Sequence, residues 1–164
     1  MVSGRAWQVA AEVADPELPV VTLADLGILR AVDETPAGVV VTITPTYSGC
    51  PAMAAIRADV AAALRAAGYA PVEVRTRLAP PWTTDWITER GRRRLAEAGL
   101  APPGAAPARA SGPVPLSLGP RRGVPCPRCG AGRTEERSRF GATACTALWW
   151  CQDCREPFEH VKEI

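Results

Sequence analysis

The sequence predicts an α+β fold, in which a small three-stranded sheet packed by helices precedes a four-cysteine zinc ribbon. Three observations lead to this fold class. Residues 1–100 alternate short β-branched runs with helical periodicity in the order αββαβα. Residues 101–120 are rich in Pro, Gly, Ala and Ser, as linkers are, and residues 121–164 carry two Cys-x-x-Cys pairs. We therefore expect two modules, 1–100 and 121–164, joined by a linker over 101–120.

The first three elements are predicted from helix-breaking residues and from residues that favour strands. A helix is expected from Trp7 to Ala14, ended by Asp15 because the residue before a proline is disfavoured in the helical region. Residues 28–33 read as a strand, and residues 39–44 are the best strand in the chain, with Val39, Val41 and Ile43 on one face. The turn-forming residues 35–38 between them predict a hairpin.

The second half of this module should contain two more helices around a third strand. A helix is expected from Pro51 to about Ala67, because proline suits the first helical position and apolar residues recur at helical spacing. Residues 72–78 alternate apolar and charged side chains, which is typical of a strand. A last helix should cover residues 84–98 and end at Gly99.

Composition excludes several classes of protein. The chain has 164 residues, 22% charged and 47% hydrophobic, with a net charge of +2. That charge is too small for a general nucleic-acid or membrane coat. No apolar run approaches the length of a membrane span, and charged residues interrupt the N-terminus, so we expect a cytoplasmic protein. The one histidine excludes a two-His metal site and disfavours a Ser-His-Asp hydrolase.

The cysteine-rich tail predicts a closed metal site. Cys126 and Cys129 form one Cys-x-x-Cys pair and Cys151 and Cys154 the other, separated by twenty-one residues. Two such knuckles complete a tetrahedron of thiolates, which suits structural Zn(II). An iron site of rubredoxin type is the main alternative metal, and redox dithiols or disulfides are the alternative chemistry. Cys145 lies between the knuckles and is either a core residue or an exchange ligand.

Cys50 is the candidate functional thiol of the first module. It directly precedes the Pro51 helix, whose unpaired N–H groups and dipole would stabilise a thiolate. Residues 46–49 before it form a flexible approach loop. The alternative is a buried cysteine that serves as a small apolar residue.

Several motifs carry a resemblance to known families. Residues 15–19 (DPELP), 22–28 (TLADLGI) and 44–53 (TPTYSGCPAM) resemble the MIP18-like family, also called domain of unknown function 59, which is associated with iron–sulfur cluster assembly. Three further motifs narrow the resemblance to one family, namely residues 80–87 (PPWTTDWI), 99–103 (GLAPP) and 140–145 (FGATAC). Together they are similar to the family of D (or J) subunits of phenylacetyl-CoA epoxidases. The resemblance covers nearly the whole chain.

The resemblance implies a non-catalytic accessory subunit of a multicomponent di-iron monooxygenase in phenylacetate degradation, which assists iron or iron–sulfur centre assembly or repair. Its partners would be the other epoxidase subunits. Cys50 matches the family thiol and would touch iron or a cluster transiently. A cluster usually needs four ligands, so Cys50 would need further ligands, for example from a second copy across a dimer. Asp15, Glu17 and Asp25 match family acids, although loop acids also commonly cap backbone N–H groups.

Two other functions compete with this interpretation. Zinc ribbons occur in nucleic-acid-binding proteins and this tail is rich in Arg, but acidic residues dilute its charge and few aromatic residues accompany it. A thiol enzyme using Cys50 would need a general base, and His160 is the one histidine available.

The last helix carries a candidate docking surface. Its members combine guanidinium groups with indole rings, which are enriched at interaction hot spots. They are Trp82, Trp86, Arg92, Arg93 and Arg94. The alternative is a solvated helix face with tryptophans that close the core.

Overall fold

The computed structural model describes residues 4–106 and 123–163. The N-terminal module contains α1 (Arg5–Ala11), β1 (Leu29–Thr35), β2 (Gly38–Ile43), α2 (Met53–Ala66), β3 (Val72–Thr76), the 3-10 helix η1 (Thr84–Trp86) and α3 (Glu89–Glu97). The ribbon module contains β4 (Leu100–Ala101), β5 (Thr134–Ser138), β6 (Thr146–Cys151) and β7 (Pro157–Val161). The predicted α+β class and the order of elements in the N-terminal module are confirmed.

The first sheet has the order β1-β2-β3. β1 and β2 form the expected antiparallel hairpin, with an irregularity between Leu29 and Ala31. β3 pairs with β2 in parallel, from Val39 opposite Val72 to Ile43 opposite Thr76. A parallel neighbour requires a crossover, and α2 provides it.

One layer of helices covers this sheet. Val39, Val41 and Ile43 of β2 alternate toward the core and are buried. They pack in one cluster with the buried stripe of α2, whose members are Ile56, Val60 and Leu64. The helical periodicity of the sequence thus identified the core face of α2.

The single helix expected over residues 84–98 is wrong. The structure has η1, then an extended residue at Ile87, then α3 from Glu89. The Thr88 hydroxyl accepts a hydrogen bond from the Gly91 N–H at 3.0 Å and so caps α3. A threonine N-cap starts a new helix, because it requires extended backbone at its own position.

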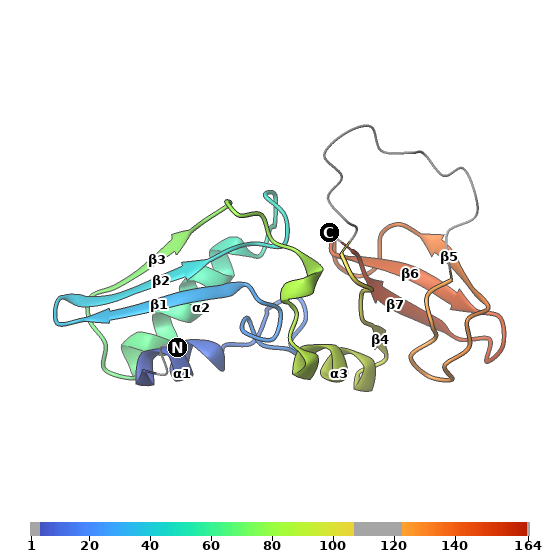
Figure 1. The fold of residues 1–164 in the computed structure, drawn as a ribbon, viewed down its shortest axis with the longest axis horizontal. Coiled ribbons are helices and arrows are strands. Elements are labelled where there is room, and N and C mark those ends of the chain that lie inside the picture. The colour runs from blue at the N-terminus through green and yellow to red at the C-terminus, as the bar shows by residue number, and fades with distance from the viewer. Residues whose placement is uncertain (1–3, 107–122, 164) are drawn as a thin grey trace.

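The second sheet has the order β4-β7-β6-β5. β4 pairs in parallel with β7, so that Leu100 lies opposite Glu159 and Ala101 opposite His160. The expected linker over 101–120 thus begins inside a strand, and its residues 107–120 lie outside the described part of the chain. Figure 1 shows the two sheets side by side along the long axis, with α3 and β4 between them.

The ribbon module contributes side chains to two different cores. Trp149, Cys151 and Phe158 pack with Cys126, Ala147 and Ala101 in the ribbon's own cluster. Cys145 and Val161, in contrast, belong to the large core of the N-terminal module. The ribbon thus meets the N-terminal core at one end of its sheet, where Val161 lies opposite Thr146 and Cys145 directly precedes β6.

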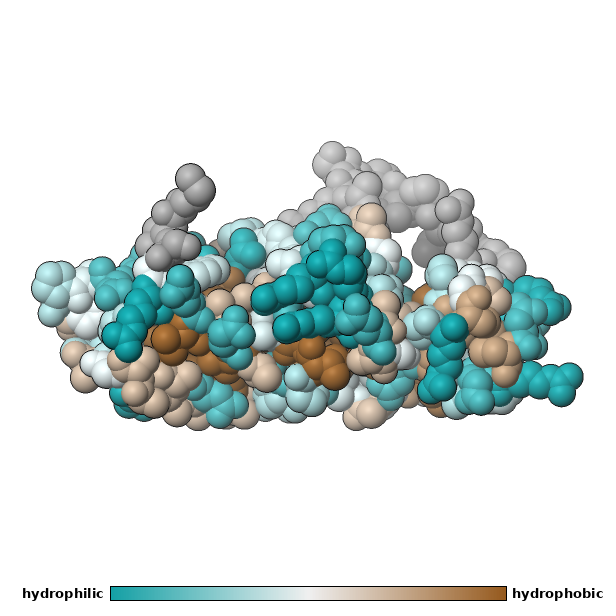
Figure 2. Space-filling view, turned by 90° about the horizontal axis from the view of Figure 1, so that it is seen from below, coloured by the Kyte–Doolittle hydropathy of each residue, from teal (hydrophilic) through white to brown (hydrophobic). Residues whose placement is uncertain are grey.

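Polar side chains gather on one face of the molecule (Figure 2). Figure 2 shows hydrophilic side chains gathered over the middle of one face, in the part of the molecule where Figure 1 places α3. Apolar areas on this face are small and bordered by polar residues. In the described ranges, no helix combines the length and apolar character that a membrane span requires.

Candidate functional site

Two Cys-x-x-Cys turns of the ribbon module face each other. In the first, the Gly130 N–H donates to the Cys126 carbonyl at 2.8 Å, and Gly130 has a φ of 75°, a conformation that glycine adopts without strain. In the second, which joins β6 to β7, the Cys151 N–H donates to the Glu156 carbonyl at 3.0 Å. These tight turns bring both thiols of each pair to the same side.

The four thiols form a tetrahedral donor set. The Sγ atoms of Cys126, Cys129, Cys151 and Cys154 all lie within 4.8 Å of one another. Cys126 and Cys154 are 3.8 Å apart and Cys129 and Cys151 are 3.6 Å apart. Thiolates about 2.3 Å from a central Zn(II) would be about 3.8 Å apart, so the residues fit such an ion. The four thiols could therefore bind a metal ion, and their spacing fits Zn(II) and iron alike.

Electrostatics in this cluster favours a cation. Backbone N–H groups, chiefly that of Cys154, lower the pKa of the Cys151 thiol to about 7. Burial, followed by the neighbouring thiols, raises the pKa of Cys154 to about 12. The neighbouring thiols thus oppose ionisation of Cys154, and a divalent metal ion would relieve that repulsion because it replaces their protons.

Cys50 lies where expected, in the loop before α2, but its electrostatics differ from the prediction. Its N–H donates to the Tyr47 carbonyl at 3.3 Å, and the residue is half-buried. Burial raises the pKa of the Cys50 thiol, hydrogen bonds from the Ala52 and Met53 N–H groups lower it, and Glu17 and Asp15 raise it. The net shift is upward, so the expectation of a thiolate stabilised by the helix terminus is wrong.

Asp15 organises the loop that carries Glu17. One carboxylate oxygen of Asp15 accepts hydrogen bonds from the Glu17 N–H at 2.9 Å and the Leu18 N–H at 2.8 Å. Burial raises the pKa of Asp15, and these two hydrogen bonds lower it by less. Asp15 thus performs the capping role that was the alternative for a loop acid. The Glu17 side chain remains available to other groups at this place.

Cys145 joins this group from the ribbon module. Its Sγ lies 3.9 Å from Oε2 of Glu17, and the residue is only 9% exposed. Burial raises the pKa of the Cys145 thiol, and Glu17 and Asp15 raise it further. Nothing in local sequence predicts this proximity, because 128 residues separate the two partners. The available signal was the FGATAC motif, which carried the family resemblance without a stated role.

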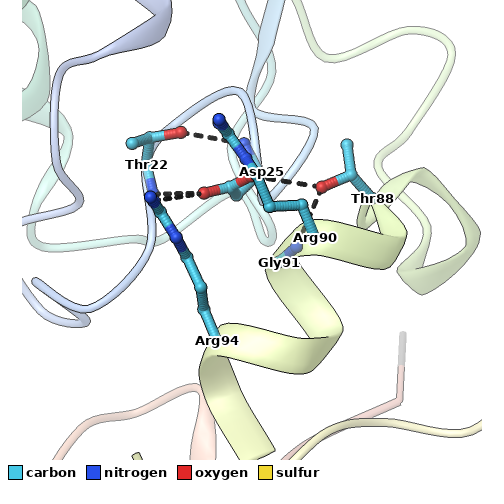
Figure 3. A network of polar contacts seen from close by, with 6 residues as sticks. All are labelled: Thr22, Asp25, Thr88, Arg90, Gly91 and Arg94. Atoms are coloured by element: carbon cyan, nitrogen blue, oxygen red, sulfur yellow. Dashed lines mark hydrogen bonds and ion pairs between the residues drawn. The ribbon is translucent and has the colours of Figure 1, made fainter. Parts of the chain in front are cut away.

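Asp25 has a different place from the other family acids. Its side chain is almost fully buried, and it pairs with the guanidinium groups of Arg90 at 2.7 Å and Arg94 at 3.1 Å. The Thr88 hydroxyl and the Thr22 N–H also donate to this carboxylate. Figure 3 shows this network, which connects the loop after α1 to α3. Asp25 is therefore a structural residue in this arrangement, and the expectation that it supports the thiol is not supported by its contacts.

The candidate docking surface is largely occupied by contacts within the chain. Trp82 is 4% exposed, and its indole N–H donates to the Leu26 carbonyl at 2.9 Å, so it is a core residue and not an exposed anchor. Trp86 is half-buried beneath Arg30, whose guanidinium carbon lies 3.6 Å from the ring centroid. Arg92 donates to the carbonyls of Thr84 and Pro103.

Arg93 and Arg94 are the other two arginines of the expected docking surface. Arg94 pairs with the buried Asp25, while Arg93 is exposed. Arginines of α3 donate hydrogen bonds to backbone carbonyls and to the Asp25 carboxylate. These contacts fix the helix onto the loop that carries Asp25. The segment therefore connects parts of this chain, while Arg93 and part of the Arg94 side chain, which is 41% exposed, stay open to solvent.

Comparisons with known proteins agree with this two-part arrangement. Residues 7–75 match the family model described as an iron–sulfur cluster assembly protein, and residues 110–162 match that described as a PaaD zinc beta ribbon domain. A crystal structure of a domain of unknown function DUF59 from Bacillus anthracis has 28% identity and a TM-score of 0.51, covering 56% of this chain and 88% of that one. The fold and the site thus define a MIP18-like domain joined to a cysteine-rich ribbon.

Two further relatives were found. A Mycobacterium tuberculosis solution structure, of a protein associated with Fe–S complex assembly and repair, is 33% identical with a TM-score of 0.33, over 56% of this chain and 81% of that chain. An Escherichia coli (strain K12) protein, provisionally named as the D subunit of 1,2-phenylacetyl-CoA epoxidase, is 43% identical over 96% of this chain and 91% of its own length. The chain therefore belongs to the family of epoxidase D subunits.

Proposed function

We propose that this chain is a non-catalytic accessory subunit of a phenylacetyl-CoA 1,2-epoxidase, a multicomponent di-iron monooxygenase of phenylacetate degradation. In this role it assists the assembly or repair of an iron or iron–sulfur centre in the other subunits. Family membership along almost the whole chain supports the pathway. The match of residues 7–75 to an iron–sulfur cluster assembly model supports the assembly role.

The observation that carries the proposal is the position of Cys50. This thiol is half-buried before the N-terminal end of α2 and lies within electrostatic range of two carboxylates, Asp15 and Glu17. Thiolate and carboxylate ligands together suit iron, and a partly exposed site permits transfer of the ion. Burial raises the pKa of the Cys50 thiol, and a metal ion that bound there would displace its proton.

The structure disfavours a thiol enzyme. His160 is buried on β7 and packs edge-on against Trp149, with 5.9 Å between the ring centroids. Val161, the next residue, belongs to the core shared with the N-terminal module. Because neighbouring strand residues point to opposite faces, His160 points away from the side of Cys50 and offers no general base there.

Nucleic-acid binding is disfavoured by pairing of charges within the ribbon module. Arg133 contacts Asp153, Arg137 lies 3.6 Å from Glu135, and Arg139 lies 3.9 Å from Glu136. These arginines thus have acidic neighbours on the same surface. A nucleic-acid site instead needs unpaired cations that can neutralise phosphates.

The experiment is co-expression with the remaining epoxidase subunits, followed by measurement of iron in the oxygenase and of epoxidase activity. Cys50→Ala should fold normally but lower both the iron content of the oxygenase and the epoxidase activity. Cys50→Ser, which preserves the size of the side chain, is the matched control. Growth on phenylacetate as fast as wild type, with full iron in the oxygenase, would show that the thiol has no role in assembly. The chain would then be a scaffold.

A further inference from the structure

A cavity lies on the face of the ribbon sheet that carries Trp149. Its volume is about 960 Å³, a size typical of small-molecule sites. Ala147 and Trp149 of β6 line it together with His160 of β7. These three share one face of the sheet, because Ala147 lies opposite His160 and Trp149 follows two residues later. Among the described residues, neither Cys50 nor a cysteine of the four-thiol cluster lines this cavity.

The Trp149 indole carries a hydrogen-bond donor that lacks an acceptor. Trp149 is 5% exposed, and its Nε1–H finds no acceptor among the residues that the structure describes. A buried donor left in this state costs free energy, so native proteins normally provide it with a partner. Trp82 shows the contrast, since its equally buried indole N–H donates to the Leu26 carbonyl at 2.9 Å. A ligand oxygen in the cavity would satisfy the Trp149 donor.

His160 adds a second polar group beside Trp149. It is buried, and the two rings pack edge-on with 5.9 Å between their centroids. Burial lowers the pKa of this imidazole, although the carboxylates of Glu163 and Glu136 oppose that shift. A neutral imidazole offers one donor and one acceptor nitrogen. The two side chains together therefore complement a group that has both a carbonyl oxygen and an N–H, as a carboxamide does.

The charged side chains that line the cavity balance one another. Arg139 lies 3.9 Å from Glu136. Lys162 donates to a backbone carbonyl at 2.8 Å, and Glu163 accepts a hydrogen bond from a backbone N–H at 3.2 Å. Two cations thus accompany two carboxylates in the described lining, so no net charge favours an anionic or a cationic ligand.

Aromatic and proline rings supply the apolar part of the lining. Phe140 lines the cavity although its side chain is largely open to solvent, at 73% exposure. Pro102, Pro103 and Pro125 add rigid apolar rings. An exposed aromatic ring beside a buried indole gains most from a flat partner that covers both, because aromatic rings stack and exclude water. The lining therefore favours a ligand with a planar aromatic body.

We propose that this cavity is a binding site for a small, uncharged aromatic carboxamide. The ring of the ligand packs against Trp149 and Phe140, and its carbonyl oxygen accepts the hydrogen bond of the Trp149 N–H. Binding requires no covalent or redox step. The site is independent of the proposed assembly role, and it gives the ribbon module a ligand-binding task in addition to its cysteine cluster.

The test uses the full-length chain, labelled with nitrogen-15 and loaded with Zn(II), and naphthalene-2-carboxamide as the probe. Titration should shift the Trp149 indole N–H resonance in a saturable manner, and Trp149→Phe identifies that resonance by its absence. Naphthalene-2-carboxylate has the same size but carries a negative charge, so it should bind at least about fivefold more weakly.

Variants separate the hydrogen bond from the stacking, with affinities measured by the fluorescence of the probe. Trp149→Phe keeps a ring but removes the donor and should weaken binding by about fivefold. Trp150→Phe is the matched control, because Trp150 lies on the opposite face of β6 and should bind as wild type does. Phe140→Ala changes an exposed residue, so it should fold, and it should also weaken binding.

Several results would overturn the site. They are a Trp149 resonance that does not respond to the carboxamide, a carboxylate that binds as tightly, and unchanged affinity in folded, zinc-loaded Trp149→Phe. Should Trp149→Phe fail to fold, Phe140→Ala and the comparison of the two probes in wild type still decide. Equal affinity of Phe140→Ala and wild type would then contradict the stacking arrangement.

Discussion

Cys50 illustrates how local and tertiary electrostatics compete at one residue. The N–H groups of Ala52 and Met53 lower its pKa, as the start of a helix should. Burial has the largest influence, however, and together with Glu17 and Asp15 it gives a net rise. The sequence context alone indicates an activated thiol, whereas the folded environment keeps the proton in place.

This competition makes a testable prediction about reactivity. Glu17→Gln removes a nearby negative charge, so the pKa of Cys50 should fall and its alkylation at neutral pH should become a few-fold faster. Iodoacetamide labelling followed by peptide mass spectrometry measures the rate, with Glu12→Gln as the control. In metal-free wild type, Cys50 should also react faster than the more buried Cys145. An unchanged rate in Glu17→Gln would show that this carboxylate does not control the thiol.

Asp25 makes a prediction about pH. Burial tends to raise its pKa, but the Arg90 hydrogen bond and its other partners lower it overall. A lowered folded-state pKa stabilises the protein above the unfolded-state value of about 4, and this stabilisation is lost as the pH falls through the folded-state pKa. Asp25→Asn should therefore reduce the free energy of unfolding at pH 7 by about 2 kcal/mol, less than for a fully buried pair because the arginines are half-exposed.

Urea unfolding at pH 7 and at pH 3 measures this effect. The loss of stability between the two pH values should be smaller in Asp25→Asn than in wild type. Asp33→Asn is the control, since Asp33 is exposed on β1. Equal pH dependence in all three proteins would contradict the assignment of Asp25 as the carboxylate that fixes α3.

At the scale of elements, we expect the ribbon strands to depend on a metal ion bound between their turns. The ribbon's own cluster has few large side chains, so a bound metal should supply much of its stability. Cys151→Ser should release one metal ion per chain and remove the hydrogen-exchange protection of β5, β6 and β7. Strands β1 to β3 should stay protected, because their core is built mainly within the N-terminal module.

Metal analysis and hydrogen exchange test this prediction together. Cys50→Ser is the matched control, because it removes a thiol outside the ribbon and should leave the ribbon metal in place. A metal-free variant with fully protected ribbon strands would mean that the ribbon folds without its ion. Loss of protection in both modules would show that their shared core makes them one cooperative unit.

At the scale of the whole molecule, the two modules are joined by strand pairing and by a shared core. β4 belongs to the ribbon sheet although it directly follows α3, and Cys145 and Val161 pack into the N-terminal core. Limited proteolysis within 101–120, the expected linker, should yield two fragments that stay associated in native size-exclusion chromatography. Fragments that separate without denaturant would contradict the docking, and first cleavage within residues 39–67 would contradict the placement of the domains.

Local patterns in the sequence determined the α+β class, the hairpin, the core face of α2 and the four ribbon cysteines. Each of these depends on neighbours in the chain: alternation for strands, helical spacing for α2, and two-residue gaps for the knuckles. The same reasoning missed the break before α3, because Thr88 acts as a cap only when Asp25 and the turn around Ile87 hold it. Local propensity cannot report such contacts.

Only the tertiary structure decided where the functional side chains meet. Cys145 lies beside Glu17 although the two are 128 positions apart in the sequence. Asp25 pairs with an arginine of α3, and Trp82 is buried with its indole N–H bonded to the Leu26 carbonyl instead of forming a surface. The reason is physical: the pKa and accessibility of a side chain depend on burial and on charges from other elements, and docking of the ribbon sets both. The sequence by itself determined which groups are present, and packing determined which of them act together.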